Sequence, residues 1–374
     1  VTAPLVAMGA GAFAVAMDFD DAMRQVQAVT GETGTKFTEL REAALQMGAD
    51  TAFSSSQAAD AMLQLGQAGF TADEIMISTA DVLSLASAGA LDLGTAAGIT
   101  ANAMNGFGMS AGDTAQIVDV LAKGASISTT SVEGLGNGLS YVAPVAHAMG
   151  MSLEETVSIL ASLSNAGIEG ERAGTALRGA ISRLAAPSNE AAKALANYGL
   201  SLEDVNPATH TFTQILDTLS AAGITSADVM QIFGQEAGPG VLALLGQGTG
   251  AIKEQTLALQ NSKDAAQQMA ETMEGGVGGA WRQFTGSVET LAIVLGDLVA
   301  KGLTPVIEFL TRLFNVISGL PEPVMLVVVA VGALAAAIGP VLTVAGILIS
   351  SVGAITTALG AAGLGGALTT VVGI

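Results

Sequence analysis

Cysteine is absent from this 374-residue chain, and charged and aromatic residues are scarce. Without cysteine the chain can form neither disulfides nor thiolate metal sites. Charged residues make up 12% of the chain and apolar residues 50%, whereas a typical soluble domain is about 25% charged. So few charged residues cannot solvate the surface of a 374-residue protein. We therefore expect the surface to be covered by self-association, by a partner lumen or by a membrane.

Basic residues are the rarer of the charged types, with 13 Lys and Arg against 33 Asp and Glu, which gives a net charge of -20. None lies between Arg41 and Lys123. Nucleic-acid binding needs Lys and Arg to displace counterions from phosphates. The sequence therefore predicts no direct nucleic-acid binding.

Catalytic motifs are also lacking. The two histidines, His147 and His210, are isolated and do not have the spacing of a metal-binding motif. The GxSxG letters at 108–112 (GMSAG) belong to a predicted corner between helices and not to the strand–turn–helix of a nucleophile elbow, and the chain has no phosphate-binding P-loop. The adjacent Glu154 and Glu155 face different ways on a helix. We therefore predict no catalytic residues, no cofactor and no metal, and hence a protein that is not an enzyme.

Helical periodicity is what the sequence does contain. Apolar residues recur at helical spacing, as in Val132, Leu135, Leu139 and Val142, and no stretch alternates with the period of two that is typical of strands. The predicted fold class is all-α. We expect a compact bundle of short helices, then longer amphipathic helices and a hydrophobic helical hairpin.

One short phrase recurs five times: Gly, an apolar residue, Ser or Thr, two further residues, and Asp or Glu. Its copies are GFTADE at 69–74, GMSAGD at 108–113, GMSLEE at 150–155, GLSLED at 199–204 and GITSAD at 223–228. A left-handed Gly closes one helix, and Ser or Thr caps the next, with the acid completing a capping box. Each copy predicts a corner between helices. We assign residues 18–245 to a helical core domain, with corners too irregularly spaced for a true solenoid.

The ends of this core differ from it. Residues 1–17 are apolar but lack the basic region of a signal peptide, and Pro4, Gly9 and Gly11 interrupt them. We interpret them as a lead-in from a longer chain. After the core, residues 251–274 predict one polar helix, ended by the glycine-rich segment 275–279.

Residues 246–320 as a whole predict amphipathic, coiled-coil-like helices. Their apolar residues are spaced alternately by three and four, with a break at Gly302, as in a coiled-coil seam. The seam residues are Trp281, Phe284, Val288, Leu291, Leu295, Leu298, Leu303, Ile307, Leu310, Phe314 and Ile317. The pattern leaves two alternatives open, a self-assembly seam or a helix that faces its own core.

Residues 321–374 form the last predicted domain, a hydrophobic, membrane-active segment. No charge occurs from Pro323 to Ile374. Gly339 and Pro340 separate two apolar stretches, 324–338 and 341–359, of which the second approaches the length of a membrane-spanning helix. We expect a hairpin that turns at Gly339 and Pro340 and inserts conditionally into a membrane.

Four segments resemble the tail tape measure proteins of long-tailed bacteriophages. They are DFDDAMRQVQAVTG at 18–31, AGIEGERAGTALRGAISRLAAPS at 166–188, WRQFTGSVETLAIVLGDLVAKGLTPVIEFLTRLF at 281–314 and PEPVMLVVVAVGALAAAIGPVLTVAGIL at 321–348. The resemblance covers about 18–360 and rests on the order of the segments. It implies a virion protein inside the tail tube that fixes tube length and leaves ahead of the DNA. Its hydrophobic segments are implied to help the genome across the host membrane.

The resemblance also implies several copies per tail, of which we favour a trimer, docked on the tail tube and on distal tail or baseplate hub proteins. A ruler must be an extended helix, at about 1.5 Å per residue, and residues 18–245 are too often broken to be one. We therefore expect this chain to be the anchored end of the tape, near the tail tip, and to meet the host membrane after release. A secreted helical pore-forming protein unrelated to phage is the alternative, and a hydrolase is the third class.

Overall fold

The computed structural model describes the backbone of residues 2–318, and the side chains of residues 12–297. The described residues are helical and contain no strand, which confirms the all-α prediction. The chain divides into two compact units, one of Val1–Asp18 with Leu291–Ile374, and one of Phe19–Thr290. The predicted domain boundaries remain a prediction.

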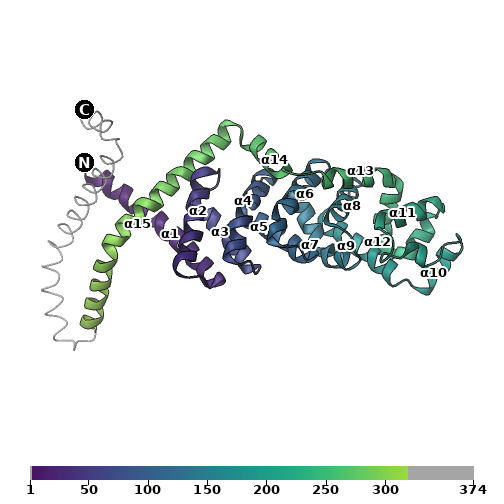
Figure 1. Ribbon diagram of the computed structural model, residues 1–374, viewed down its shortest axis with the longest axis horizontal. Coiled ribbons are helices and arrows are strands. Elements are labelled where there is room, and N and C mark those ends of the chain that lie inside the picture. The colour runs from purple at the N-terminus through teal and green to yellow at the C-terminus, as the bar shows by residue number, and fades with distance from the viewer. Residues whose placement is uncertain (1, 319–374) are drawn as a thin grey trace. The chain divides into compact units, whose positions relative to one another are not determined.

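Most of the larger unit is a series of short helices that stack in two rows, here named the ladder (Figure 1). Its members are α2 (Gly34–Asp50), α3 (Ser55–Gln67), α4 (Ala72–Gly89), α5 (Leu93–Phe107), α6 (Thr114–Ser126), α7 (Val132–Ala148), α8 (Leu153–Asn165), α9 (Gly170–Ala185), α10 (Asn189–Ala196), α11 (Phe212–Ala221) and α12 (Ser226–Gln247), with short 3-10 turns η1 (Ala111–Asp113) and η2 (Glu203–Val205). Helices α3, α5, α7, α9 and α12 pack in succession along one row, and α4, α6 and α8 along the other. The apolar positions predicted from periodicity, such as Leu135 and Val142, are buried.

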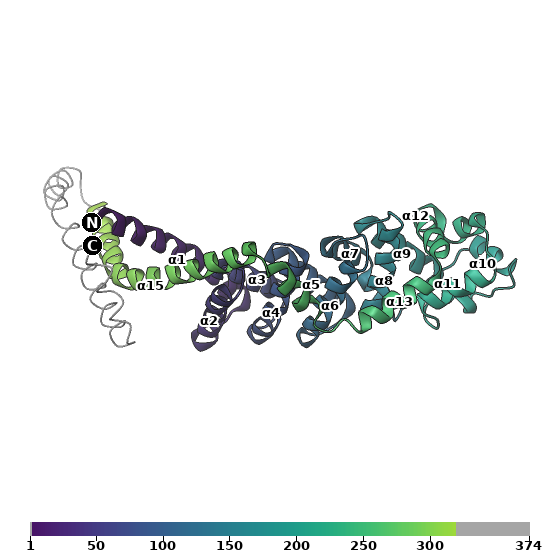
Figure 2. The same cartoon turned by 90° about the horizontal axis from the view of Figure 1, so that it is seen from above.

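After α12 the chain turns back along the ladder (Figures 1 and 2). Helix α13 (Thr249–Gln260) packs on α8 and α6, and α14 (Ala265–Glu274) on α6 and α4. The first turns of α15 (Val277–Ser318) then reach the end of α2 and the start of α3. We name residues 249–290 the return strap.

The five predicted corners have the expected backbone. Their glycines, Gly69, Gly108, Gly150, Gly199 and Gly223, have φ between +63° and +96°. In each corner the next residue donates its N–H to the carbonyl five positions earlier, at 3.0–3.4 Å. This is the Schellman arrangement that satisfies the last carbonyls of a helix.

The acids of the corners differ in their partners. Glu74, Asp113 and Asp204 each accept the N–H of their own cap residue at 2.8 Å, as predicted for a capping box. Glu155 instead accepts the N–H and hydroxyl of Thr213, and so caps α11. Asp228 accepts the hydroxyl of Tyr198 at 2.6 Å. These two acids therefore join elements that are distant in sequence.

Helical glycines let the helices of one row approach closely. A Cβ on Gly174 of α9 would lie 2.1 Å from the carbonyl oxygen of Gly138 in α7. A Cβ on Gly106 of α5 would likewise lie 2.6 Å from the Cβ of Ala143. Any larger residue at these positions would force the helix backbones apart.

One local prediction was wrong. Residues 251–274 form two helices rather than one, because Asp119 accepts the N–H groups of Asp264 and Ala266 at 2.7 and 2.9 Å and so starts a new helix there. The second of these, α14, ends at Glu274, where the glycine-rich segment begins as predicted. Helix α15 begins at Val277 within that segment, and residues 2–17 are part of helix α1 (Thr2–Thr30).

In the smaller unit, α1 and α15 meet at small side chains. A Cβ on Gly296 would lie 2.5 Å from both the carbonyl oxygen of Ala12 and the Cβ of Ala16. Ala16 is buried at this contact. The small residues therefore face inward on α15 within this unit.

Candidate interaction surface

The predicted seam lies on the outer face of α15 where its side chains are described. Trp281, Phe284, Val288 and Leu291 are 63%, 57%, 49% and 59% exposed. The rings of Trp281 and Phe284 lie against each other, with centroids 5.6 Å apart. Leu295 is half-buried. Within the larger unit, Trp281, Phe284 and Val288 thus form an apolar stripe on the surface of α15.

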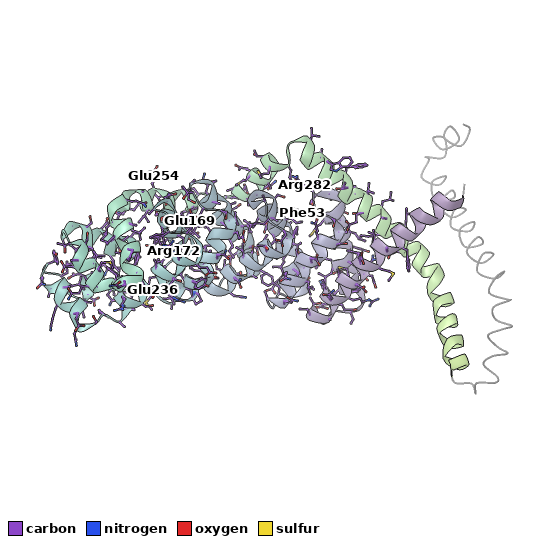
Figure 3. The ribbon with its side chains drawn as sticks, turned by 180° about the vertical axis from the view of Figure 1, so that it is seen from behind. Phe53, Glu169, Arg172, Glu236, Glu254 and Arg282 are labelled. Atoms are coloured by element: carbon purple, nitrogen blue, oxygen red, sulfur yellow. The ribbon has the colours of Figure 1, made fainter. Side chains whose placement is uncertain are left out.

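The opposite face of α15 consists of small and polar residues. Gly286 is buried against the backbone of Phe53 and Gly48, where a Cβ would lie 2.8 Å from the Phe53 carbonyl oxygen. Thr290 and Ser55 share a hydrogen bond of 2.9 Å between their hydroxyls. This helix therefore presents its small face to the ladder and its apolar face outward. Figure 3 labels Phe53 and Arg282 in this part of the molecule.

The remaining predicted residues fall outside the described side chains. Helix α15 includes the backbone of the other seam positions, but nothing is described of the side chains of Leu298, Leu303, Ile307, Leu310, Phe314 and Ile317. Gly339 and Pro340, and the whole hydrophobic segment 321–374, also lie outside the described residues. The self-assembly seam and the membrane hairpin therefore stay predictions.

Within the described residues, no single helix has the length and hydropathy needed to cross a membrane. Helices α4 and α5 meet that requirement only when taken together, and they are bent by 114° at their junction.

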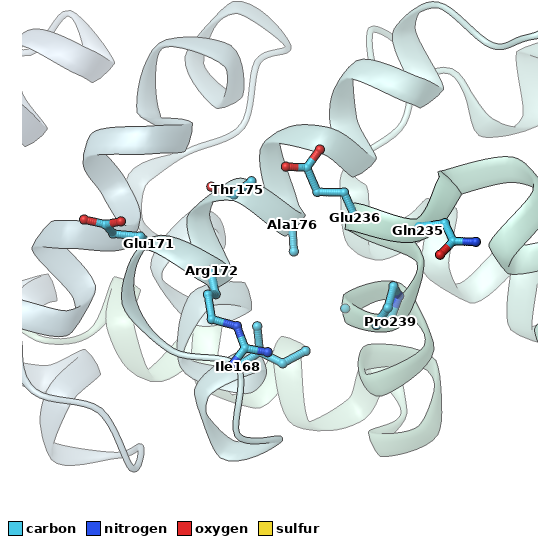
Figure 4. Close-up of a pocket in the computed structure, with 9 residues that line it drawn as sticks. Ile168, Glu171, Arg172, Thr175, Ala176, Gln235, Glu236 and Pro239 are labelled. Atoms are coloured by element: carbon cyan, nitrogen blue, oxygen red, sulfur yellow. The ribbon is translucent and has the colours of Figure 1, made fainter.

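A pocket of about 370 Å³ lies between α9 and α12 (Figure 4). Glu171 and Arg172 come from the first turn of α9, and Glu236 and Pro239 from α12. In the close-up the charged ends of Arg172 and Glu236 point in different directions. The lining thus combines opposite charges without bringing them together, and it does not form a catalytic constellation.

The buried carboxylates of the ladder have structural partners. Asp119 and Glu155 are buried and accept backbone N–H groups of α14 and α11. Burial, and then the negative charge of Asp119, raise the pKa of Asp81. Between residues 12 and 297, no three His, Asp or Glu side chains gather in a group that could hold a metal ion.

The two histidines lie apart. His147 packs edge-on against Phe107, with ring centroids 6.4 Å apart. His210 contacts Thr209 through Nδ1 at 3.0 Å. Neither has a carboxylate within hydrogen-bond reach that would make it a general base.

Comparison with known proteins agrees with the resemblance seen in the sequence. The family model of phage-related minor tail proteins matches residues 41–238. The chain is 33% identical over 355 residues to the tape measure protein of Pneumococcus phage Dp-1, an alignment that covers 93% of this chain and 31% of the relative. It is 29% identical over 306 residues to a probable tape measure protein of Escherichia phage P2, covering 79% of this chain and 38% of the relative.

A third relative, the probable tape measure protein of Clostridium phage phiCD119, is 26% identical over 278 residues, which cover 70% of this chain and 29% of the relative. The chain thus spans about a third of the length of the curated relatives that it matches. No solved structure matches it. The resemblance to tape measure proteins is confirmed: the chain belongs to the family of phage-related minor tail proteins and is a structural protein of the bacteriophage tail.

Proposed function

We propose that this chain is the folded, anchored part of a tape measure protein, which lies in the tail tube near the tip and acts in tail assembly and length control. The observation that carries the proposal is the broken backbone of the ladder, in which left-handed glycines end one helix after another. A ruler requires an uninterrupted helix, at about 1.5 Å per residue. A series of helices that turn back on one another instead provides a surface for docking.

A deletion tests this part of the proposal. Removing residues 108–149 joins α5 directly to the corner at Gly150 and removes one corner-to-corner segment. Because the deleted helices pack between α5 and α8, we expect tails to fail in assembly. If the chain were part of the ruler, tails would instead shorten by roughly 60 Å, at about 1.5 Å per residue. Electron micrographs of the deletion virions distinguish the two outcomes.

We infer that the partners are other copies of this chain, in a trimer, and the tail tube and tip proteins. The exposed apolar stripe of α15, whose residues have the spacing of a coiled-coil seam, supports the self-association. Several apolar side chains that point outward from one helix are typical of a contact between proteins.

A second role, in genome delivery across the host membrane, follows from the uncharged residues 323–374. Without charge, this segment meets no electrostatic barrier to entering lipid. Peptides spanning 321–360 are expected to release dye from liposomes. A Val344→Arg peptide is expected to release much less, because a central Arg costs about 2.5–3.5 kcal/mol on insertion scales. If the wild-type peptide neither partitions into liposomes nor releases dye, the role in genome delivery is excluded. The same result excludes the alternative of a pore-forming protein.

A further inference from the structure

The return strap, residues 249–290, carries its apolar side chains on the outside. Its exposed large apolar residues are Leu257, Met273, Val277, Trp281, Phe284 and Val288. In the same 42 residues the large apolar side chains that are fully buried are Ile252 and Leu259. An amphipathic helix on a globular surface normally has the reverse arrangement, with its apolar face toward the core.

Polar groups hold the first strap helix, α13, on the ladder. The hydroxyl of Ser158 donates to the carbonyl of Ile252 at 3.0 Å and accepts from the hydroxyl of Thr256 at 2.9 Å. Lys253 pairs with Asp217 at 2.6 Å, on the surface. This contact therefore combines the polar groups of Ser158 and Asp217 with two buried apolar side chains of α13, Ile252 and Leu259.

The second strap helix, α14, depends on the ladder for its start. Asp119 of α6 accepts the N–H groups of Asp264 and Ala266. At the other end of α14, the carboxylate of Glu274 accepts the hydroxyl of Ser87 in α4. Ala266 and Ala270 are its buried side chains, so little apolar surface is covered here.

The third part of the strap, the start of α15, is held in the same way. Ser55 and Thr290 share a hydrogen bond, and Glu289 accepts the N–H of Ser56 at 3.2 Å. Ser287 donates to the carbonyl of Ala49 at 3.3 Å. All three parts of the strap thus contact the ladder through hydrogen bonds, and Ile252 and Leu259 are the large apolar side chains that the strap buries.

From this reversed polarity we propose that the return strap is a releasable arm, which opens from the ladder as one unit while the ladder stays folded. On opening, most of the broken hydrogen bonds are replaced by bonds to water, so their net contribution to closure is small. The contacts between the ladder helices themselves stay in place, and the apolar surface that opening uncovers is that beneath Ile252 and Leu259. Local opening with a lower free energy than global unfolding is expected of a segment with few buried apolar contacts.

Opening lets the chain lengthen at this point without unfolding the ladder. The inference goes beyond the proposed function and does not depend on it, because it concerns a motion of the isolated chain. Its occurrence can be measured by hydrogen exchange whether or not the chain docks at a tail tip.

Disulfide locks provide the experiment, and the absence of cysteine makes each introduced pair the only thiols in the chain. One strap lock is Ser55→Cys with Thr290→Cys, and the other is Ser158→Cys with Thr256→Cys. The matched control is Ser78→Cys with Thr114→Cys, which joins two ladder helices. In all three pairs the hydroxyl oxygens lie 2.9 Å apart, so the side chains already point toward each other as a disulfide requires.

Hydrogen–deuterium exchange of the full chain in mild detergent gives the readout. In the unmodified chain we expect amides of the strap to exchange at least about tenfold faster than those of α5, α7 and α8. Either oxidised strap lock is expected to slow exchange throughout α13, α14 and residues 277–290, with reversal by reductant. The oxidised ladder control is expected to leave strap exchange unchanged.

Two results would overturn the inference. Equal exchange of strap and ladder amides in the unmodified chain means that the strap does not open separately, and this measurement needs no substitution. Protection confined to the helix that carries the disulfide means that the strap does not open as one unit.

Discussion

The apolar stripe of α15 makes a quantitative prediction for self-association. Replacing Phe284 and Val288 together by Asp should abolish oligomers while the ladder stays folded. Both side chains are about half exposed, at 57% and 49%. The half of each that the single chain buries contributes about 1 kcal/mol to its stability, and the core of the ladder does not include either side chain.

The expected loss of association follows from the exposed area. Fully burying a large apolar side chain contributes about 1.5–3 kcal/mol. Because about half of each side chain is still exposed, burial in an interface would add about 1 kcal/mol per residue and per copy. The double substitution therefore removes about 2 kcal/mol per copy, and it adds the cost of burying two unpaired carboxylates. Together these effects weaken association by more than about a hundredfold.

Sedimentation of the purified full chain in mild detergent measures the effect, with circular dichroism as the check that the helices remain. Leu257→Asp is the matched control, since Leu257 is 60% exposed but lies on α13, away from the seam. The control is expected to sediment like the wild type, and the double variant as a monomer. A double variant with the wild-type oligomer, or a wild type that is already monomeric at micromolar concentration, would refute the reasoning.

Three further predictions concern the stability of the ladder. Ala90 has the left-handed conformation (φ 51°), so Ala90→Gly should stabilise the fold by about 1 kcal/mol, measured by urea denaturation. Gly174→Ala should destabilise it by about 3 kcal/mol, since the new Cβ would meet a backbone carbonyl of α7. Gly246→Ala, with open space around it, is the control and should be neutral or slightly stabilising. Burial and the charge of Asp119 raise the pKa of Asp81 in the folded chain, so ionisation of Asp81 opposes folding. The free energy of unfolding therefore falls as the pH rises from the unfolded to the folded pKa of Asp81. Asp81→Asn should match the wild type in acid and exceed it modestly at pH 7; equal stabilities at both pH values would contradict this.

The corners were predictable because all their determinants are adjacent in sequence. A glycine, a capping hydroxyl and an acid three residues later specify a helix end and a helix start by local hydrogen bonds alone. Left-handed glycine and the Schellman bond occur at all five positions. The partners of Glu155 and Asp228 were not predictable, because Thr213 and Tyr198 reach them only in the folded unit.

The return strap could not be predicted from the sequence either, because its partners on the ladder are distant in sequence. Residues 251–274 have the periodicity of one helix, and the break before α14 is imposed by Asp119, which lies 145 residues earlier than Asp264. The orientation of α15 was likewise left open, because the seam spacing is equally compatible with an inward and an outward apolar face. Over residues 277–290, Gly286 accounts for the observed orientation, because a glycine permits the backbone contact with Phe53 on the small face of the helix.

The distribution of helix caps explains why the ladder can remain folded without the strap. The ladder helices α4, α5, α7 and α8 take their N-terminal caps from adjacent residues, as Ser152 does for α8. At α3, where Glu289 of the strap binds the N–H of Ser56, Ser54 and Gln57 form a complete capping box of their own. Helix α14 has no such local cap and depends on Asp119. Opening therefore leaves helix ends of the strap without their partners, and water can reach those ends. The N-termini of these ladder helices keep their local caps. As regards helix ends, the cost of opening falls on the strap, while the ladder loses the two N–H partners of Asp119.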